Sequence, residues 1–312
     1  MSFDWRAHDL SERHRLPSSG TPGLSLALRA RGAGSPVLFV HGATFSGRIF
    51  DIPHPELNWL QVAADAGFAA YALDIRGYGL SRPDSFPDRP YATGDEAVAD
   101  IADAVDWIST RHGGGPVALV GWSWGSITTR RYVAGPGRGR VSALVQYAPI
   151  HAEVNEGWRD LLADPGDRGR LRDLGAVRLV DMPDTRARWD AQLPPGAAWR
   201  SEAALEAIVG ASIADDGDPA GTTFRVPNGT FVDLWECFNG REIQDPAAVT
   251  CPTLLVRGTA DPTSTRSDAL LLFERLGTGR KQYLEIADGS HFLNAEVHAP
   301  ALFSAVHAFL GA

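Results

Sequence analysis

One serine, Ser123, lies within Gly-Trp-Ser-Trp-Gly at residues 121–125, between a continuous apolar run and a segment with the composition of a helix. A strand, a sharp turn and a helix in this order form a nucleophile elbow, in which a strained turn lifts the serine hydroxyl above a sheet. The residues two before and two after such a serine lie against neighbouring backbone, where only a small side chain fits. This explains Gly121 and Gly125. The pattern predicts a serine nucleophile beside a helix N-terminus that favours developing negative charge.

A serine hydroxyl becomes a nucleophile when a base takes its proton and an acid orients that base. His291 follows the last predicted strand and precedes the last predicted helix, so we expect its loop at the same sheet edge as Ser123. Asp261 follows another buried strand in Arg-Gly-Thr-Ala-Asp-Pro, ahead of His291 in the chain. Glu153 is the rival acid, because it is the first carboxylate after the strand that follows the elbow helix. We predict His291 as the base and Asp261 as the acid.

Attack on a carbonyl also requires N–H donors for the oxyanion that forms. Residues 39–47, Phe-Val-His-Gly-Ala-Thr-Phe-Ser-Gly, end a buried strand and then turn. We predict the backbone amides of Ala43 and Trp124 as the donors. His41 precedes the turn, and we interpret it as a structural residue that holds this loop.

The elements that must position these residues follow an alternation of short apolar runs and amphipathic segments. This alternation predicts an α/β fold with a mostly parallel, helix-flanked central sheet. The predicted strands are 24–30, 36–42, 69–75, 116–121, 142–148, 253–258 and 281–287. Helical spacing predicts a helix over 95–113, and a final helix over about 295–310.

The alternation stops between His151 and Val249. A structureless loop of that length is improbable in a compact domain, so we predict an inserted, mainly helical cap over 151–249. Residues 1–150 and 250–312 then form the core; the alternative is an ordinary continuation of the sheet. Ligand pockets are mostly apolar, so we expect Trp122, Trp158 and Trp235 to contact a small-molecule substrate.

Composition and charge exclude several classes of protein. No apolar run approaches the roughly 20 residues of a membrane helix, and the first residues have no apolar signal-peptide core, so we expect a cytoplasmic protein without a membrane partner. A net charge of −9 argues against a nucleic-acid partner. The arginine-rich stretch 168–188 has interleaved acids and is interpreted as a solvated helix face.

The two cysteines, Cys237 and Cys251, are too far apart in sequence for a metal knuckle or a Cys-x-x-Cys redox pair. We expect both to be reduced and structural. The sequence predicts no metal and no cofactor, and it leaves the oligomeric state open.

With these residues assigned, the chain resembles the α/β-hydrolase superfamily over nearly its whole length. The resemblance rests on His-Gly-Ala-Thr-Phe-Ser-Gly at 41–47, Leu-Asp-Ile-Arg-Gly-Tyr-Gly-Leu-Ser at 73–81, the elbow, and the loops of Asp261 and His291. The order Ser, Asp, His along the chain is also similar to that family. The resemblance implies the α/β-hydrolase fold and a structural role for the turn at 73–81. A serine at the elbow differs from the aspartate of haloalkane dehalogenases and epoxide hydrolases.

The resemblance further implies a serine hydrolase that cleaves a carboxylic ester, lactone or thioester of a small apolar or aromatic substrate through an acyl-enzyme. A C–C bond hydrolase is an alternative, as is a proline iminopeptidase, which would need acids such as Glu153, Glu156 and Glu236 to hold an amine. A non-catalytic ligand receptor on the same fold is the alternative from another class. The intact set of serine, aspartate and histidine argues against it.

Overall fold

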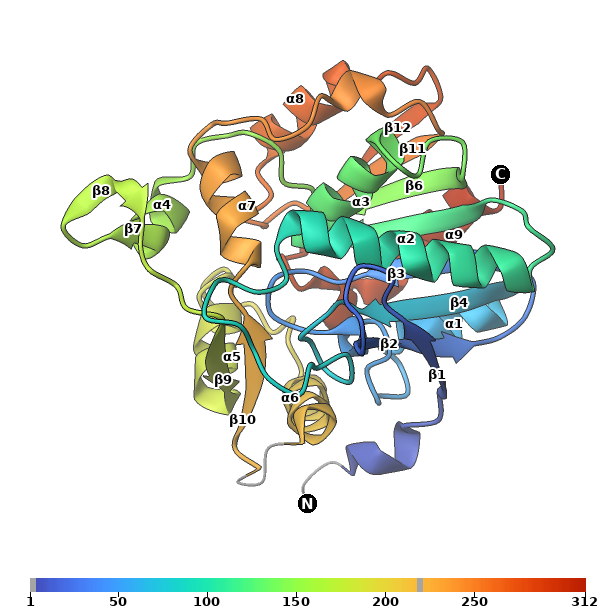
Figure 1. Cartoon of the computed structure of the whole chain (residues 1–312), viewed down its shortest axis with the longest axis horizontal. Helices are drawn as coiled ribbons and strands as arrows, with labels where there is room; N and C mark the ends of the chain where they lie inside the picture. Colours follow the sequence, from blue (N-terminus) through green and yellow to red (C-terminus); the bar gives the residue numbers. More distant parts are fainter. Residues whose placement is uncertain (1–3, 218–220) are drawn as a thin grey trace.

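An eight-stranded sheet forms the centre of the computed structural model, which describes residues 4–217 and 221–312 (Figure 1). The strand order across the sheet is β1-β2-β4-β3-β5-β6-β11-β12. The pairs β1–β2 and β2–β4 are antiparallel, and the other neighbours run parallel. The bounds are β1 Glu12–Pro17, β2 Ser25–Arg31, β3 Ser35–Val40, β4 Phe68–Asp74, β5 Val117–Trp122, β6 Val141–Tyr147, β11 Thr253–Gly258 and β12 Lys281–Ile286.

The structure confirms the mostly parallel, helix-flanked sheet, and each of the seven predicted strands corresponds to an observed one within one or two residues. Strands β4, β5 and β11 are buried along their whole length, which accounts for their continuous apolar runs. Strand β1 was not predicted. Its residues are mostly charged and exposed because it lies at the edge of the sheet, where polar side chains prevent pairing with another chain.

The register of the parallel strands brings the site loops to one edge. Val40 at the end of β3 pairs with Leu73 of β4 and Gly121 of β5, and Gly258 at the end of β11 pairs with Ile286 of β12. The loops that follow β3, β5, β11 and β12 therefore all leave the sheet at its carboxyl edge, where open α/β sheets form their sites.

Helices cover both faces of the sheet. Figure 1 shows α2 (Gly94–Arg111) and α3 (Trp124–Ala134) in front of it, and α1 (Trp59–Asp65) and α9 (Ala299–Leu310) behind it. Helix α8 (Arg266–Arg275) connects β11 to β12. The helix predicted over 95–113 is α2. The final helix starts later than predicted, because Leu293–Ala295 form a separate 3-10 turn and a proline in the first turn begins α9. Among the described residues, no helix has the length and apolarity needed to cross a membrane.

The turn at 73–81 has the structural role that we expected. The Asp74 carboxylate accepts the amide hydrogens of Gly47 at 2.9 Å and Leu80 at 3.0 Å. The Ser81 hydroxyl donates to the Asp74 carbonyl at 2.6 Å and accepts the amide hydrogen of Ala27 at 2.7 Å. These bonds fasten the turn to β2 and to the loop after β3, and none of them involves Ser123.

The chain between β6 and β11 leaves the sheet and lies beside it, at the left of Figure 1. It contains α4 (Glu156–Leu162), α5 (Met182–Asp190), α6 (Glu202–Asp216), α7 (Thr230–Phe238) and the 3-10 turn η3 (Pro246–Ala248). Two small antiparallel pairs accompany the helices: β7 (Ala163–Asp164) with β8 (Asp167–Leu171), and β9 (Val177–Asp181) with β10 (Thr223–Pro227). The sequence did not predict these pairs. The interpretation of 168–188 as one helix face is wrong, because this stretch runs through β8, β9 and α5.

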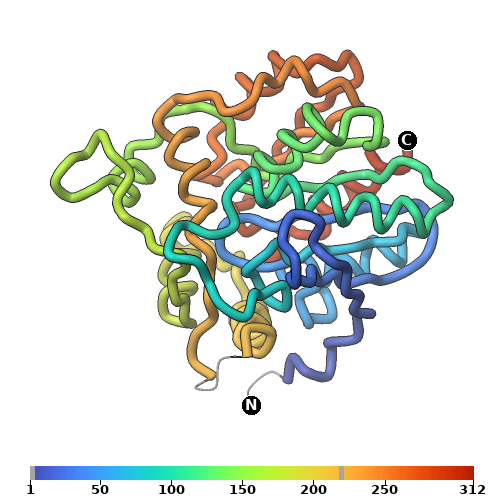
Figure 2. Tube along the Cα trace, viewed as in Figure 1, coloured from blue at the N-terminus to red at the C-terminus, as the bar shows by residue number. Residues whose placement is uncertain are grey.

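A buried ion network fastens α6 to the sheet. Asp215 of α6 bonds to Arg29 of β2 at 2.5 Å and to Arg48 at 2.9 Å, and Arg48 also reaches Asp9 at 2.8 Å. The side chains of Asp215, Arg29 and Arg48 are at most 4% exposed. Figure 2 shows the N-terminal chain approaching the α6 end of the molecule. The network therefore joins the segment between β6 and β11 to the N-terminal half of the chain.

Candidate active site

Ser123 occupies the turn between β5 and α3 with φ 56° and ψ −120°, which is a strained conformation for a residue with a side chain. The turn is possible only because its neighbours are glycines. A Cβ atom on Gly121 would lie 2.3 Å from the carbonyl oxygen of Gly125, and one on Gly125 would lie 2.2 Å from that of Val40. The structure thus gives a steric reason for both glycines, as predicted for a nucleophile elbow.

The structure brings Ser123, His291 and Asp261 together in one chain of hydrogen bonds. His291 Nε2 lies 2.8 Å from Ser123 Oγ, and His291 Nδ1 lies 2.8 Å from Asp261 Oδ2. The other carboxylate oxygen, Oδ1, accepts the amide hydrogens of Thr263 at 2.8 Å and Ser264 at 2.9 Å. Because these amides hold the carboxylate in place, Oδ2 faces the imidazole and accepts the proton on Nδ1. Nε2 is then free to take a proton from the serine hydroxyl.

The rival acid, Glu153, is occupied elsewhere. Its carboxylate accepts hydrogen bonds from the hydroxyls of Thr265 and Ser267, in the turn before and at the start of α8. His291 contacts Asp261 and not Glu153. The acid that lies beside His291 is therefore Asp261, and not its rival Glu153.

A buried carboxylate that the sequence did not single out holds the histidine loop. Glu296 accepts the amide hydrogen of Ser290 at 3.0 Å, the Ser290 hydroxyl, and the indole N–H of Trp189 at 2.9 Å. Glu296 is fully buried, and Ser290 directly precedes His291. Glu296 thus fixes the backbone that carries the imidazole and connects it to α5. No local sequence signal marks this residue.

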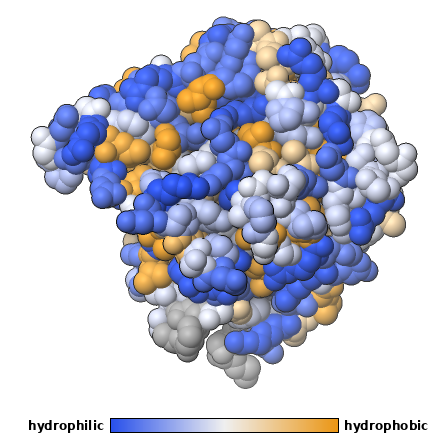
Figure 3. Space-filling view, viewed as in Figure 1, coloured by the Kyte–Doolittle hydropathy of each residue, from blue (hydrophilic) through white to orange (hydrophobic). Residues whose placement is uncertain are grey.

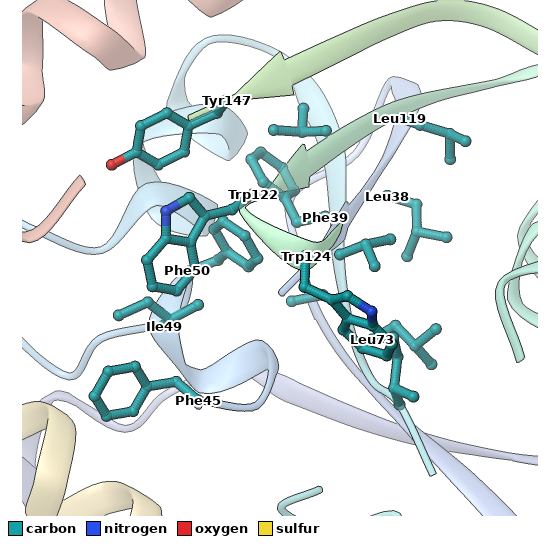
Figure 4. Close-up of a cluster of buried hydrophobic side chains, with 14 of the residues drawn as sticks. Leu38, Phe39, Phe45, Ile49, Phe50, Leu73, Leu119, Trp122, Trp124 and Tyr147 are labelled. Carbon is teal, nitrogen blue, oxygen red and sulfur yellow. The ribbon is translucent and has the colours of Figure 1, made fainter. Parts of the chain in front are cut away.

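The two tryptophans beside Ser123 have different roles, and Figure 4 shows their rings on different sides of the strand end. The Trp122 indole N–H donates to the carbonyl of His291 at 3.0 Å, and the two rings lie 5.5 Å apart. The Trp124 indole N–H donates to Asp233 of α7 at 2.8 Å. Burial raises the pKa of the Asp233 carboxyl. Trp122 therefore supports the histidine loop, and the Trp124 side chain joins the elbow to α7.

His41 holds the loop that carries the first predicted oxyanion donor. Its Nδ1–H donates to the Gly42 carbonyl at 2.8 Å, and its Nε2 accepts the amide hydrogen of Ile75 at 3.1 Å. Burial lowers the pKa of His41 to about 4, so the ring is neutral at neutral pH and can make both bonds. The N–H and C=O of a trans peptide point in opposite directions, so the amide of Ala43 points away from His41. The structural interpretation of His41 is confirmed.

The Ala43 loop is also held from the segment between β6 and β11. The Ala43 carbonyl accepts hydrogen bonds from the Tyr78 hydroxyl at 3.2 Å and from Arg178 of β9 at 2.8 Å. Burial lowers the pKa of Arg178 to about 10, which still leaves the guanidinium charged at neutral pH. Trp124, the second predicted donor, is the first residue of α3, where a backbone N–H has no acceptor within the helix.

Ser123 and His291 line a cavity of about 20 Å³, room for about one water molecule. Its wall includes five residues from the segment between β6 and β11, which are Ile150, Trp158, Arg188, Gln192 and Leu234. A second basin of about 410 Å³ lies next to it and shares Trp158, Arg188, Gln192 and Thr263. These shared side chains therefore separate the small inner cavity from the larger outer basin.

Two of the three tryptophans predicted to contact the substrate lie in the wall of the inner cavity. Trp122 and Trp158 line the inner cavity, whereas Trp235 does not, and its neighbour Leu234 does. Successive residues of a helix point about 100° apart, so only one of the two can face the cavity. The Trp235 side chain, on the same helix α7, is instead buried in the hydrophobic core. Arg188 and Gln192 also line the cavity, although no sequence pattern singled them out.

Possible metal ligands are not clustered in the part of the chain that the structure describes. Within residues 4–217 and 221–312, no group of three or more histidine, cysteine, aspartate or glutamate side chains is arranged to hold a metal ion. Cys237 and Cys251 are both free thiols. Burial raises the pKa of Cys237 to about 12, so its thiol is unreactive at neutral pH.

Comparisons with known proteins show which family and fold this chain resembles. The model described as "Alpha/beta hydrolase family" matches residues 37–306. An epoxide hydrolase from Caballeronia sordidicola is 29% identical over 129 residues, which cover 40% of this chain and 35% of that enzyme. The chain thus spans about a third of the length of this curated relative.

Two solved structures share the fold. A bromoperoxidase from Bacillus anthracis is 19% identical, with a TM-score of 0.69 and coverage of 96% of this chain and 100% of that one. An esterase from Thermogutta terrifontis is 19% identical, with a TM-score of 0.64 and coverage of 96% and 98%. At this identity the likeness shows a common fold and does not identify a common substrate.

Proposed function

The chain belongs to the alpha/beta hydrolase family, and from this premise we propose that it is a serine hydrolase acting on a carboxylic ester, lactone or thioester. One observation carries the proposal. His291 lies 2.8 Å from the Ser123 hydroxyl on one side and 2.8 Å from the Asp261 carboxylate on the other. A nucleophile, a base and an orienting acid in this geometry fit acyl transfer.

Acylation begins when Ser123 Oγ attacks the substrate carbonyl and His291 Nε2 takes the hydroxyl proton. Asp261 keeps the second proton on Nδ1 and stabilises the imidazolium that forms. The amides of Ala43 and Trp124 donate to the oxyanion of the tetrahedral intermediate, an interaction for which each donor typically contributes about a hundredfold or more in rate. His291 then protonates the departing alcohol or thiol, and an acyl group remains on Ser123.

Deacylation repeats these steps with water as the nucleophile. His291 takes a proton from a water molecule as that water attacks the acyl-enzyme carbonyl. The second tetrahedral intermediate collapses, Ser123 leaves with the proton returned from His291, and the carboxylic acid is released.

Residues 151–249 act as a cap in this proposal. They supply Trp158, Arg188, Gln192 and Leu234 to the cavity wall, and Arg178 to the Ala43 loop. The inner cavity of about 20 Å³ is too small for an acyl group. Substrate binding therefore requires movement of the side chains between the cavity and the outer basin.

The alternatives differ in how well the residues support them. A proline iminopeptidase needs acids free to bind an amine, but Glu156 pairs with Arg159 at 2.8 Å and Glu236 pairs with Arg241 at 2.8 Å. Neither glutamate lines the cavity. A C–C bond hydrolase remains an alternative, because the same three side chains can serve it.

The proposal is tested by kinetics of Ser123→Ala with aryl esters, lactones, acyl thioesters and vinylogous diketones assayed side by side. We expect turnover of at least one ester, lactone or thioester to fall about ten-thousandfold or more in the variant, with an unchanged circular dichroism spectrum. Ser142→Ala, which changes an exposed serine on β6, should keep wild-type activity. Near wild-type turnover by Ser123→Ala would refute the assignment, and turnover of the diketones alone would favour the C–C hydrolase.

A further inference from the structure

An arginine without an acidic partner faces the candidate active site. Arg188 of α5 lines both the inner cavity and the outer basin. Its Nη1 donates to the hydroxyl of Thr44 at 2.9 Å, and Thr44 directly follows Ala43. Asp184, one turn earlier on α5, acts on Arg188 through its charge, but no ion pair of Arg188 occurs in the part of the chain that the structure describes. This bond to Thr44 is the one side-chain hydrogen bond of Arg188 within the described residues, so other guanidinium donors are available to a ligand or water.

Two arginines near Arg188 are paired with acids, whereas Arg188 is not. On the same helix, Arg186 bonds to Glu202 at 2.6 Å, and Arg200 bonds to Asp190 at 2.8 Å. Arg188 is exposed to solvent, and an arginine stays protonated at neutral pH. A solvent-accessible guanidinium without an ion pair can exchange bound water for the carboxylate of a ligand, which it holds by charge-assisted hydrogen bonds.

A second unsatisfied polar group lies beside the arginine. Gln192 lines the same two cavities, and its side-chain oxygen Oε1 is buried without a hydrogen-bond partner. Whichever end of the amide occupies this place, a buried polar group without a partner is unfavourable unless a ligand or water satisfies it. Arg188 and Gln192 thus leave polar positions open on the same wall.

The rest of the outer basin is largely apolar. Its lining includes Trp158, Leu161, Ala191 and Pro262. Leu161 of α4 is 53% exposed, and Figure 3 shows hydrophobic residues gathered near the base of the protruding β7–β8 hairpin. An apolar basin with one free cation at its inner wall fits a ligand that has an apolar part and one anionic group.

On the basis of the hydrolase function proposed above, we propose that Arg188 and Gln192 form a carboxylate-binding subsite. The subsite selects esters that carry a carboxylate near the scissile bond, on the acyl or the alcohol side. The guanidinium holds the carboxylate, and the Gln192 amide binds a neighbouring polar atom of the substrate.

A role for Arg188 as an additional oxyanion donor is the competing explanation. Two backbone amides, of Ala43 and Trp124, already serve that purpose in the proposed mechanism. Arg188 also lines the outer basin, which Ser123 does not, so part of its side chain lies farther from the reacting carbonyl. The two roles differ in a measurable way. An oxyanion donor lowers kcat for every ester, whereas a carboxylate subsite changes KM for charged esters above all.

The test uses two matched pairs of esters and three variants. The acyl-side pair is the 4-nitrophenyl monoester of glutaric acid and 4-nitrophenyl valerate. The alcohol-side pair is the butyrate ester of 4-hydroxybenzoate and that of 4-hydroxybenzamide. In at least one pair we expect Arg188→Gln to lower the kcat/KM ratio of charged to neutral ester by about 10- to 100-fold, mainly through KM. Arg188→Lys should keep part of the ratio, and Arg186→Gln, the matched control on the same helix, should leave it unchanged.

Binding to Ser123→Ala separates failure of the subsite from failure of the hydrolase proposal. Calorimetry should detect glutarate or 4-hydroxybenzoate binding to Ser123→Ala, at least tenfold weakened in Ser123→Ala/Arg188→Gln. The subsite is overturned if neither acid binds, if the substitution leaves both affinity and ratio unchanged, or if both esters of each pair lose kcat equally. Turnover that survives in Ser123→Ala would instead contradict the hydrolase proposal, whatever the binding result.

Discussion

Replacing Asp261 by asparagine gives the sharpest prediction about how the site works. Asp261 Oδ1 accepts two backbone amides, at 2.8 and 2.9 Å, and Oδ2 accepts from His291 Nδ1. The one carbonyl oxygen of asparagine will stay with the two amides, because the side-chain NH₂ cannot accept from them. That NH₂ group then faces Nδ1, so the imidazole must place its own proton on Nε2. An Nε2–H cannot take the proton of Ser123.

The expected cost follows from losing the correct tautomer while the geometry stays intact. Such a change lowers kcat by about ten-thousandfold in a serine hydrolase, or about 5.5 kcal/mol in the activation barrier. Stopped assays with a 4-nitrophenyl ester measure this loss, and thermal melting checks the fold. Asp288→Asn is the matched control, because Asp288 is exposed, has φ 56° and lies in the loop before His291. Its activity should stay at the wild-type level. Asp261→Asn activity within tenfold of wild type would refute the proposed role of the carboxylate.

Two further predictions concern stability. Asp215→Asn leaves Arg29 and Arg48 without their shared buried carboxylate, so urea unfolding should show a loss of about 3–5 kcal/mol; a loss below 1 kcal/mol would contradict the network's importance. The pKa of His41 is lowered to about 4 in the folded protein, against an ordinary 6.5, so the unfolded chain binds a proton at a higher pH than the folded one. The contribution of His41 to folding stability is therefore complete above pH 6.5 and declines as the pH falls toward 4. The stability advantage of wild type over His41→Gln should shrink by about 2 kcal/mol between pH 7.5 and pH 5, and a constant difference would contradict a buried neutral ring.

The parts of the fold that the sequence predicted are those in which local composition and burial coincide. Strands β4, β5 and β11 are buried on both faces, and their sequences are therefore continuous apolar runs. Parallel strands share one carboxyl edge, so the loops of Ser123, Asp261 and His291 had to meet there. Strand β1 escaped prediction because an edge strand needs no apolar pattern, and its charged residues resemble those of a loop.

The cavity wall was harder to predict because it depends on how the segment between β6 and β11 packs. Leu234 and Trp235 are adjacent and apolar, and only the orientation of α7 decides which one faces Ser123. Arg188 lies in the arginine-rich stretch 168–188, in which some arginines, such as Arg186, form ion pairs with acids outside the stretch and others do not. Whether a given arginine forms an ion pair depends on the tertiary packing, which the sequence pattern does not reveal.

Labelling with an aryl phosphonate tests the central claim most directly, because such a reagent reacts with an activated serine and mimics the tetrahedral intermediate. Intact-mass and peptide-mapping mass spectrometry of the folded protein should show one phosphonyl group per chain, on Ser123, and no label on Ser123→Ala. Absence of labelling in the folded wild-type protein, or stoichiometric labelling at another residue, would contradict the account.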